Sequence, residues 1–337
     1  MLLHQDSKPL LAGRIICGRD GGDVVLETAD LVYTFSPPSA AIVESIVPAL
    51  DARATISAIA SRISVQPATV IAVLDELNSD EVLVLDVTRA SSASTAAEFR
   101  DALKQECGFW SREILSQPFW QVIQAGSAPK PVVLGWGIEF YHFVNSVNEY
   151  MAAGVANCRE NALVRERLAK HYIEESGHAS IFLEGLTRCG LDPVQVAAAP
   201  PLASTRSLID YLYEIALSNS VSYAAMFALM HANEALSQDA LDQFYAQLTR
   251  IYPFAEGLFE ACHKHASIDV QLEHHHTVFD AMVEDVPDTV LRQGPEAVAA
   301  VRGLAEQFML FFYGILTRYS TPLTAIPRRS FDFADVA

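Results

Sequence analysis

Carboxylates and imidazoles recur at short helical spacing within stretches of this sequence that are otherwise apolar. In the segment 171–186, HYIEESGHASIFLEGL, Glu175 and His178 stand three residues apart. On a helix of about 100° per residue they fall within about 60° of each other, with Phe182 between them, so both interrupt the apolar face. A buried carboxylate beside a buried imidazole is unfavourable unless it is paired or bound to a metal. The pattern therefore favours a buried chemical site over a solvated helix face.

Two later stretches repeat this arrangement. His265 and Asp269 lie one helical turn apart in the segment 254–283 and share a face with apolar residues, among them Leu258. Further upstream, Glu234 aligns with Tyr223 in the segment 218–236. The sequence thus offers three helices that each bring a carboxylate to a buried face.

Three rival positions stay open. His231 competes with Glu234, since it precedes it by about one turn on the same helix. Glu139 and His142 form a weaker fourth pair, which a surface ion pair or a hydrogen bond would explain adequately.

Carboxylates and imidazoles that converge in one helical bundle are typical ligands of Fe(II) or Mn(II), with positions left for oxygen. Zinc would more often recruit thiolates, and none of the five cysteines shows ligand spacing. Without a metal, Glu175 and His178 could instead serve as general base and acid.

Composition narrows the class of protein. The 337 residues include 41 acidic and 23 basic side chains, giving a net charge of −18, which disfavours nucleic acid as a partner. The scattered, odd number of cysteines predicts reduced thiols and a cytoplasmic protein. No signal peptide stands at the N-terminus, and no apolar stretch reaches about 18 residues, so we expect no membrane span.

The sequence predicts two domains. Alternating apolar runs between residues 11 and 36, separated by turns such as GRDGGD, predict strands, followed by three short helices and a strand at 82–86. We place this small α+β domain at 1–87, a Ser/Ala/Thr-rich linker at 88–100, a bundle at 101–320 and a tail at 321–337. The predicted bundle helices are 96–116, 118–125, 132–158, 160–190, 205–236, 238–283 and 295–318. The fold class is therefore mainly α.

The segment LAKHYIEESGHASIFLEGLTRCGLDP resembles the heme-oxygenase-like proteins related to thiaminase II and pyrroloquinoline-quinone synthase C. FALMHANEAL and HKHASID follow in the expected order, so the resemblance covers roughly residues 105–318. It is greatest to the diiron oxidases and oxygenases of that fold. The resemblance implies a heme-oxygenase-like bundle that uses Fe(II) and O2.

Carried over to this sequence, the resemblance implies one ligand set. Its members are the pair Glu175 and His178, the mid-bundle Glu234, and His265 with Asp269 of the late motif. The late motif departs from the family pattern, because Leu272 stands where a third histidine is expected. His276 or Glu273 replaces that ligand, or the second metal site is weakened or absent. His171 falls where some members carry a glutamate, so a mononuclear or cofactorless oxidase stays open.

The N-terminal 85 residues resemble the winged-helix domain of the pyrroloquinoline-quinone peptide chaperone, on the order of elements around VYTFSPPSAAIVESI. The resemblance implies that a leader or carrier peptide adds a strand to an exposed sheet edge. DNA binding is disfavoured, because residues 50–90 contain three arginines and no lysine among more numerous acids. A structural or dimerising role stays open.

Together these patterns predict a non-haem iron enzyme that oxidises a small amino-acid-like or peptide-borne substrate with O2 in natural-product biosynthesis. Two alternatives remain, a cofactorless oxidase or hydrolase and a non-enzymatic scaffold that binds a peptide. Bundles of this kind often dimerise, so a homodimer is a further open expectation.

Overall fold

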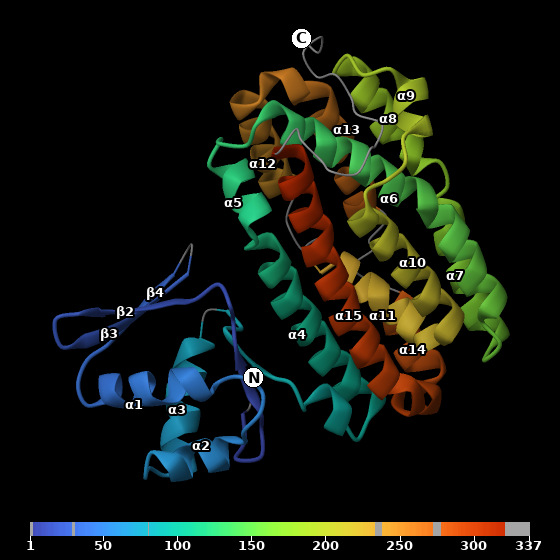
Figure 1. The fold of residues 1–337 in the computed structure, drawn as a ribbon. Coiled ribbons are helices and arrows are strands. Elements are labelled where there is room, and N and C mark those ends of the chain that lie inside the picture. Colours follow the sequence, from blue (N-terminus) through green and yellow to red (C-terminus); the bar gives the residue numbers. More distant parts are fainter. Residues whose placement is uncertain (1–2, 29–30, 80, 233–237, 272–277, 321–337) are drawn as a thin grey trace. The chain divides into compact units, whose positions relative to one another are not determined.

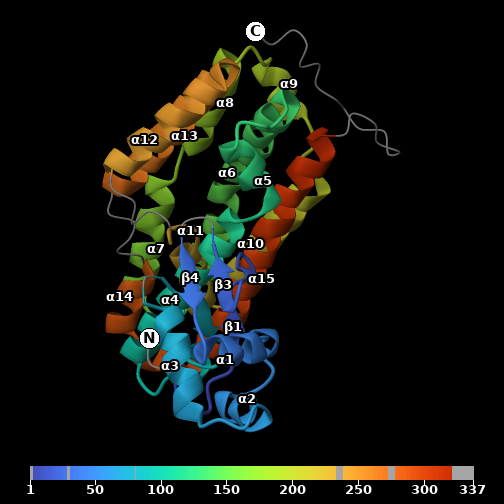
Figure 2. The same ribbon diagram turned by 90° about the vertical axis from the view of Figure 1, so that its left-hand side faces the viewer.

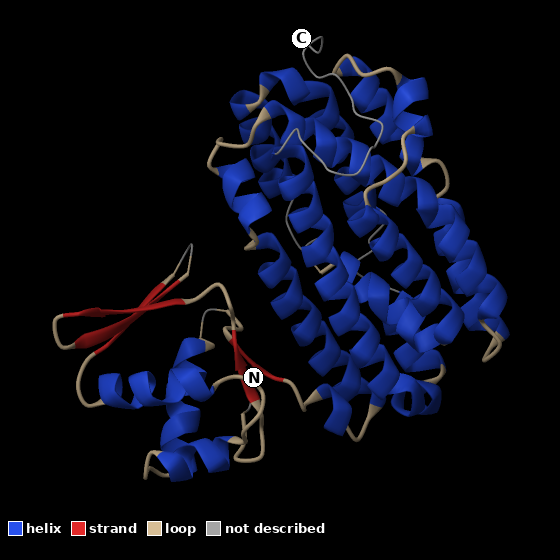
Figure 3. Ribbon diagram, in the orientation of Figure 1, coloured by secondary structure: helices blue, strands red, loops and turns tan. Residues whose placement is uncertain are grey.

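The computed structural model describes the whole chain except residues 1–2, 29–30, 80, 233–237, 272–277 and 321–337, and the side chains of 269–271. It divides into two compact units, Met1–Glu113 and Ile114–Ala337 (Figure 1). Within the described residues, strands occur only in the first unit (Figure 3). The predicted class, a mainly α chain with a small strand-containing N-terminal domain, is confirmed.

Two small sheets build the N-terminal unit. The strands β2 (Ile16–Asp20), β3 (Asp23–Glu27) and β4 (Val32–Phe35) form an antiparallel sheet, with a tight turn between β2 and β3, as the alternating pattern predicts. The sequence analysis missed β1 (Pro9–Leu11), a three-residue strand that pairs antiparallel with β5 (Val84–Asp86). So short a strand carries too little alternation to be recognised from sequence.

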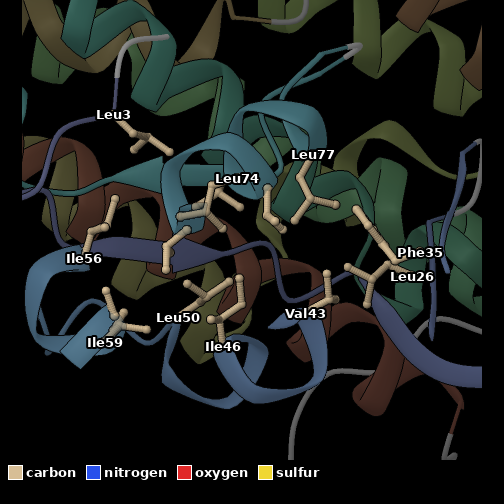
Figure 4. Packing of buried hydrophobic residues seen from close by; sticks show 14 of the residues in the cluster. Leu3, Leu26, Phe35, Val43, Ile46, Leu50, Ile56, Ile59, Leu74 and Leu77 are labelled. Carbon is tan, nitrogen blue, oxygen red and sulfur yellow. The ribbon is translucent and has the colours of Figure 1, made fainter. Parts of the chain in front are cut away.

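Three helices close the core of this unit, and all three were predicted. They are α1 (Ser39–Ile46), α2 (Ile56–Arg62) and α3 (Pro67–Leu77). Thr55 caps α2 by accepting a hydrogen bond from the Ala58 N–H. Apolar side chains from each helix meet those of β3 and β4 in one cluster (Figure 4). The resemblance to a winged helix stays a prediction.

The boundary between the compact units falls inside the helix α4 (Ala96–Leu115), beyond the predicted linker at 88–100. Two contacts explain why most of α4 belongs to the first unit. Phe109 packs against a small cluster that includes Leu83 and Leu85. Glu113 accepts hydrogen bonds from the Gly13 N–H, at 2.9 Å, and from the Arg14 guanidinium.

Replacing Arg14 by methionine is expected to lower the free energy of unfolding of the N-terminal unit by about 3 kcal/mol. The Arg14 and Glu113 side chains are each only 9 % exposed, so the change leaves a buried carboxylate without its cation. Urea unfolding of the full chain measures the loss. Arg19→Met, which breaks an exposed pair with Glu44, is the matched control and should change stability by less than about 1 kcal/mol.

Helices alone make up the described part of the second unit. They are α5 (Pro118–Gln124), α6 (Lys130–Asn157), α7 (Ala162–Glu174), α8 (His178–Arg188), α9 (Pro193–Ala198), α10 (Ala203–Ser218), α11 (Ser220–Met230), α12 (Gln238–Ile251), α13 (Glu256–Gln271), α14 (Val278–Asp285) and α15 (Pro287–Ser320). The principal pairs are α11 with α15, α8 with α13, and α10 with both α6 and α15 (Figure 2).

Three segments that were each predicted as one continuous helix are interrupted in the structure. The segment 160–190 breaks before Gly177, whose φ of +92° is accessible mainly to glycine. The segment 205–236 breaks at Asn219, whose side chain caps α11 by accepting from the Ser222 N–H. The segment 238–283 contains three helices, with a 3-10 turn at Pro253–Ala255 between the first two. Apolar periodicity survived these breaks because each new helix buries a face in the same bundle.

The last helix, α15, is longer than the predicted 295–318. By length and composition alone it could cross a membrane. In the structure it packs along α6, α10 and α11, and residues such as Phe311 and Ile315 are buried in the bundle. Core helices of bundles are often this apolar.

Candidate metal centre

The turn between α7 and α8 places the first two candidate ligands. Glu175 follows the last residue of α7, where its N–H still donates to the His171 carbonyl at 3.0 Å. Gly177 then reverses the backbone, and His178 is the first residue of α8. Both side chains are buried. The E-x2-H pair therefore lies across a helix break and not on one continuous helix.

Glu175 lies between two imidazoles. Its Oε2 is 2.9 Å from His178 Nδ1, and its Oε1 is 3.6 Å from His171 Nε2. Burial by itself raises the pKa of Glu175, but the two neighbouring imidazoles, His171 and His178, outweigh that effect and hold this pKa well below its usual range. The carboxylate is thus ionised at neutral pH and available as a metal ligand.

His265 of α13 completes a three-residue cluster. Its ring centroid lies 4.9 Å from that of His178, and Phe182 packs against it at 5.2 Å. One ligand atom from each of Glu175, His178 and His265 lies within 4.8 Å of the other two. Two imidazoles with one carboxylate are the ligand set of many non-haem Fe(II) sites. The donors therefore fit ferrous iron.

A close helix crossing brings His265 to the other two. The helices α8 and α13 lie side by side (Figure 2) and touch through Gly185 and Gly257. A Cβ built on Gly185 would lie 2.6 Å from the Gly257 carbonyl oxygen and 2.6 Å from the Ala261 Cβ. Only glycine permits this approach, so the two glycines set the distance between the helices that carry the ligands.

The other predicted ligands are only partly placed. Asp269 lies in α13, but its side chain is outside the described residues. Glu234 and His276, like Leu272 and Glu273, fall wholly outside them. These residues stay predictions.

Two further histidines lie near the cluster. The His171 ring stands 4.5 Å from Phe227 and 5.9 Å from His231. His231 follows the last residue of α11 and faces the same side of the bundle as His171. His171 Nε2 lies 3.6 Å from Glu175 Oε1, and His231 lines the same cavity as Glu175.

The fourth candidate pair has other roles. Glu139 is buried and accepts hydrogen bonds from the Leu202 N–H at 2.9 Å, the Thr205 hydroxyl at 2.6 Å and the Tyr319 hydroxyl at 2.9 Å. It therefore caps the start of α10 and ties it to α15. Burial, with a smaller effect of Arg206, lowers the pKa of His142 to about 4, which keeps this imidazole neutral.

Replacing Glu139 by leucine is expected to lower the free energy of unfolding by about 2 kcal/mol or more, because buried donors lose their acceptor. Iron binding should stay at the wild-type level, which separates this helix cap from the ligands. Chemical unfolding and ferrous iron titration measure the two effects. Glu149→Leu on the same helix is the control, since exposed Glu149 accepts only from the Tyr213 hydroxyl in the described structure and its loss should have little effect.

A cavity of about 270 Å³ opens beside the cluster. Glu175, His265 and His231 line it, and the rest of its described lining is mainly aromatic and aliphatic. Cys262 also lines it; burial, with a smaller effect of Cys189, raises the pKa of that thiol to about 12, so the thiol is neutral. The candidate ligands thus border a space large enough for part of a small molecule.

The sequence analysis missed two features of this site. The helix end at Gly177 could have been predicted from the sequence, since a glycine after polar residues often ends a helix. Tyr150 of α6 is fully buried, lines the cavity and has no hydrogen-bond partner for its hydroxyl among the described residues. No local signal distinguishes such a tyrosine from an ordinary core residue.

The comparison with protein families decides the class. A family model described as iron-containing redox enzyme matches residues 134–306, from α6 into α15. This chain belongs to that family. Membership confirms the predicted resemblance for the bundle and the prediction of an iron-containing redox enzyme. All three residues of the cluster lie inside the matched segment.

Individual relatives agree with this assignment. The chain is 25 % identical over 174 residues to 4-chloro-allylglycine synthase of Streptantibioticus cattleyicolor; the match covers 50 % of this chain and 66 % of that protein, just under two thirds of its length.

Solved structures give the fold. A crystal structure of a domain with a heme oxygenase-like fold from Shewanella denitrificans OS217 superposes with a TM-score of 0.55 at 20 % identity, over 69 % of this chain and 98 % of that one. A TenA homolog from Pseudomonas syringae pv. tomato has a TM-score of 0.48 at 15 % identity, over 68 % and 96 % of the two chains. The first of these confirms the predicted heme-oxygenase-like bundle.

Proposed function

We propose that the protein is an O2-dependent oxidase or oxygenase whose Fe(II) is held by Glu175, His178 and His265. The observation that carries the proposal is the convergence of these three ligand atoms within 4.8 Å of one another, at the edge of a cavity. A solvated cluster of acids would bind metals weakly and without a substrate space. Here a buried carboxylate and two imidazoles border one.

The residues of the candidate site have different roles. Bound ferrous iron would supply electrons to O2 at coordination positions that the protein leaves open. The carboxyl group of Glu175 is already ionised at neutral pH and supplies a negative charge. The break at Gly177 fixes Glu175 and His178 on either side of a tight turn. Apolar residues such as Phe182 exclude water from the reacting groups.

A second iron next to the first is part of the proposal. Glu175 turns one carboxylate oxygen toward His178 and the other toward His171, so an imidazole lies on each side of the carboxylate. His171 would then be a ligand of the second iron. Glu234, Asp269 and His276 are the proposed remaining ligands.

The substrate class follows from the relative and from the predicted N-terminal domain. The similarity to 4-chloro-allylglycine synthase supports a small amino-acid-like or peptide-borne substrate in natural-product biosynthesis.

Anaerobic titration with Fe(II), followed by admission of O2, tests the proposal. Two irons per chain with O2 uptake are expected. One iron per chain would support a mononuclear site and overturn the dinuclear part. Absence of iron binding, or turnover by metal-free protein, would overturn the metalloenzyme and favour acid–base chemistry by Glu175 and His178.

The N-terminal unit supports a further candidate function, capture of a leader or carrier peptide. All five residues of β2 are exposed, and β2 pairs only with β3 within the described residues. Ile16 and Val32, 70 % and 65 % exposed, flank Glu27 in one row of the sheet. An added strand along β2 would cover Ile16. Selection from a random peptide library tests this: wild type should enrich extended apolar peptides and Ile16→Lys should not.

A further inference from the structure

The cavity beside the metal ligands has an unusually uniform lining. Ten of its described lining residues are tryptophan, phenylalanine or tyrosine, including Trp120, Trp136, Phe140, Phe143, Phe308 and Phe312. Many of these rings pack edge to face on one another, as between Trp120 and Trp136 at 5.4 Å. The aromatic residues thus make up most of the wall of the cavity, and many of them pack in groups.

Charge is nearly absent from this wall. No lysine or arginine lines the cavity among the described residues, and Glu175 is the one carboxylate there. Away from the metal, a ligand carboxylate in this cavity would be desolvated without a lysine or arginine to pair with it.

The cavity also gives little stabilisation to an ammonium group of a ligand. Aromatic faces attract cations, but a strong site usually adds a carboxylate. Both oxygens of Glu175 face imidazoles, at 2.9 Å from His178 Nδ1 and 3.6 Å from His171 Nε2. The negative charge of Glu175 therefore already interacts with the two imidazoles of the metal centre.

We propose that this cavity binds an uncharged, apolar segment of the substrate, an alkyl chain or a ring, and holds it next to the metal ligands. The inference rests on the proposed function and refines its substrate class. A charged group of the substrate would find no lysine or arginine among the described residues of the cavity. An amino-acid-like substrate would therefore place its apolar side chain here, with its charged groups at the metal, masked or outside the cavity. Each buried methylene should strengthen binding about fourfold.

Metal-free protein and three eight-carbon probes test the proposal. Trp120 and Trp136 line the cavity and are two of the three tryptophans of the chain, so binding should change the intrinsic fluorescence. We expect 1-octanol to bind at least tenfold more tightly than octanoate or octylamine. 1-Hexanol, two methylenes shorter, should bind about sixteenfold more weakly than 1-octanol. Equal or tighter binding of octanoate or octylamine would overturn the proposal.

A cavity-filling variant locates the binding site. Val147→Phe should weaken 1-octanol binding at least tenfold, and Val144→Phe on the same helix provides a second variant if the first does not fold. Val194→Phe, at an exposed position of α9, is the matched control. If folded fillers bind 1-octanol like wild type, the probe lies elsewhere and the inference fails.

Failure of the inference and failure of the proposed function give different results. Iron titration does not use the probes, and probe binding does not use iron. If the protein binds iron but prefers octanoate to 1-octanol, the proposed iron site stands and the proposed apolar binding site is wrong. If it prefers 1-octanol but binds no iron, the apolar binding site stands and the proposed iron site is wrong.

Discussion

His178→Ala is expected to bind ferrous iron at least about 100-fold more weakly than wild type. Loss of groups that merely orient metal ligands weakens metal binding by about 10–100-fold, so loss of a ligand should reach or exceed the upper end. His178 is buried, lies 2.9 Å from Glu175 and belongs to the cluster with His265, so its loss removes one of the three donors of the cluster. Anaerobic titration with Fe(II), read as iron per chain, measures the effect.

His263→Ala is the matched control for this experiment. His263 lies on α13 two residues before His265, but its Nε2 faces Asp242 at 2.7 Å on α12. Because that pair is partly exposed, its loss should change stability by less than about 1 kcal/mol and leave iron binding intact. Equal iron affinity in wild type and His178→Ala would remove His178 from the ligand set.

Gly185→Ala is expected to lower the free energy of unfolding of the bundle by about 1–3 kcal/mol. The added methyl group would meet the Gly257 carbonyl oxygen at 2.6 Å, and backbone cannot rotate away as a side chain can. The helices α8 and α13 would have to separate, carrying His178 and His265 apart. Iron affinity should therefore fall together with stability, by about tenfold. Thermal unfolding and iron titration measure the two effects.

Gly108→Ala controls for the change from glycine to alanine. The nearest atom to a Cβ at Gly108 within the described residues is Arg112 Nη1, at 3.9 Å, so the methyl group has room in α4. That variant should be stabilised by about 0.5–1 kcal/mol, because alanine restricts the unfolded chain and favours helix. A Gly185→Ala protein with wild-type stability and iron affinity would show that the crossing of α8 and α13 tolerates a wider separation.

The sequence by itself determined the class of the chain and most of its elements, and it nominated the pair at the centre of the candidate site. Glu175 and His178 were nominated together because they are near neighbours in the chain, and local geometry keeps residues three apart close together even across the turn at Gly177. His265 was nominated by the same periodicity. Its partners lie nearly 90 residues away, and periodicity identifies a buried face without stating what that face meets.

Tertiary packing decided the rest. Glu139 and His178 are both buried ionisable residues in apolar helices, yet Glu139 caps a helix because the starts and ends of distant helices meet at it. Likewise Gly185 matters only because Gly257 lies against it. The aromatic wall of the cavity consists of residues that each resemble ordinary core in the sequence. Whether such a residue fills the core or faces a space depends on how several helices pack at once, which the short-range pattern of one chain segment does not specify.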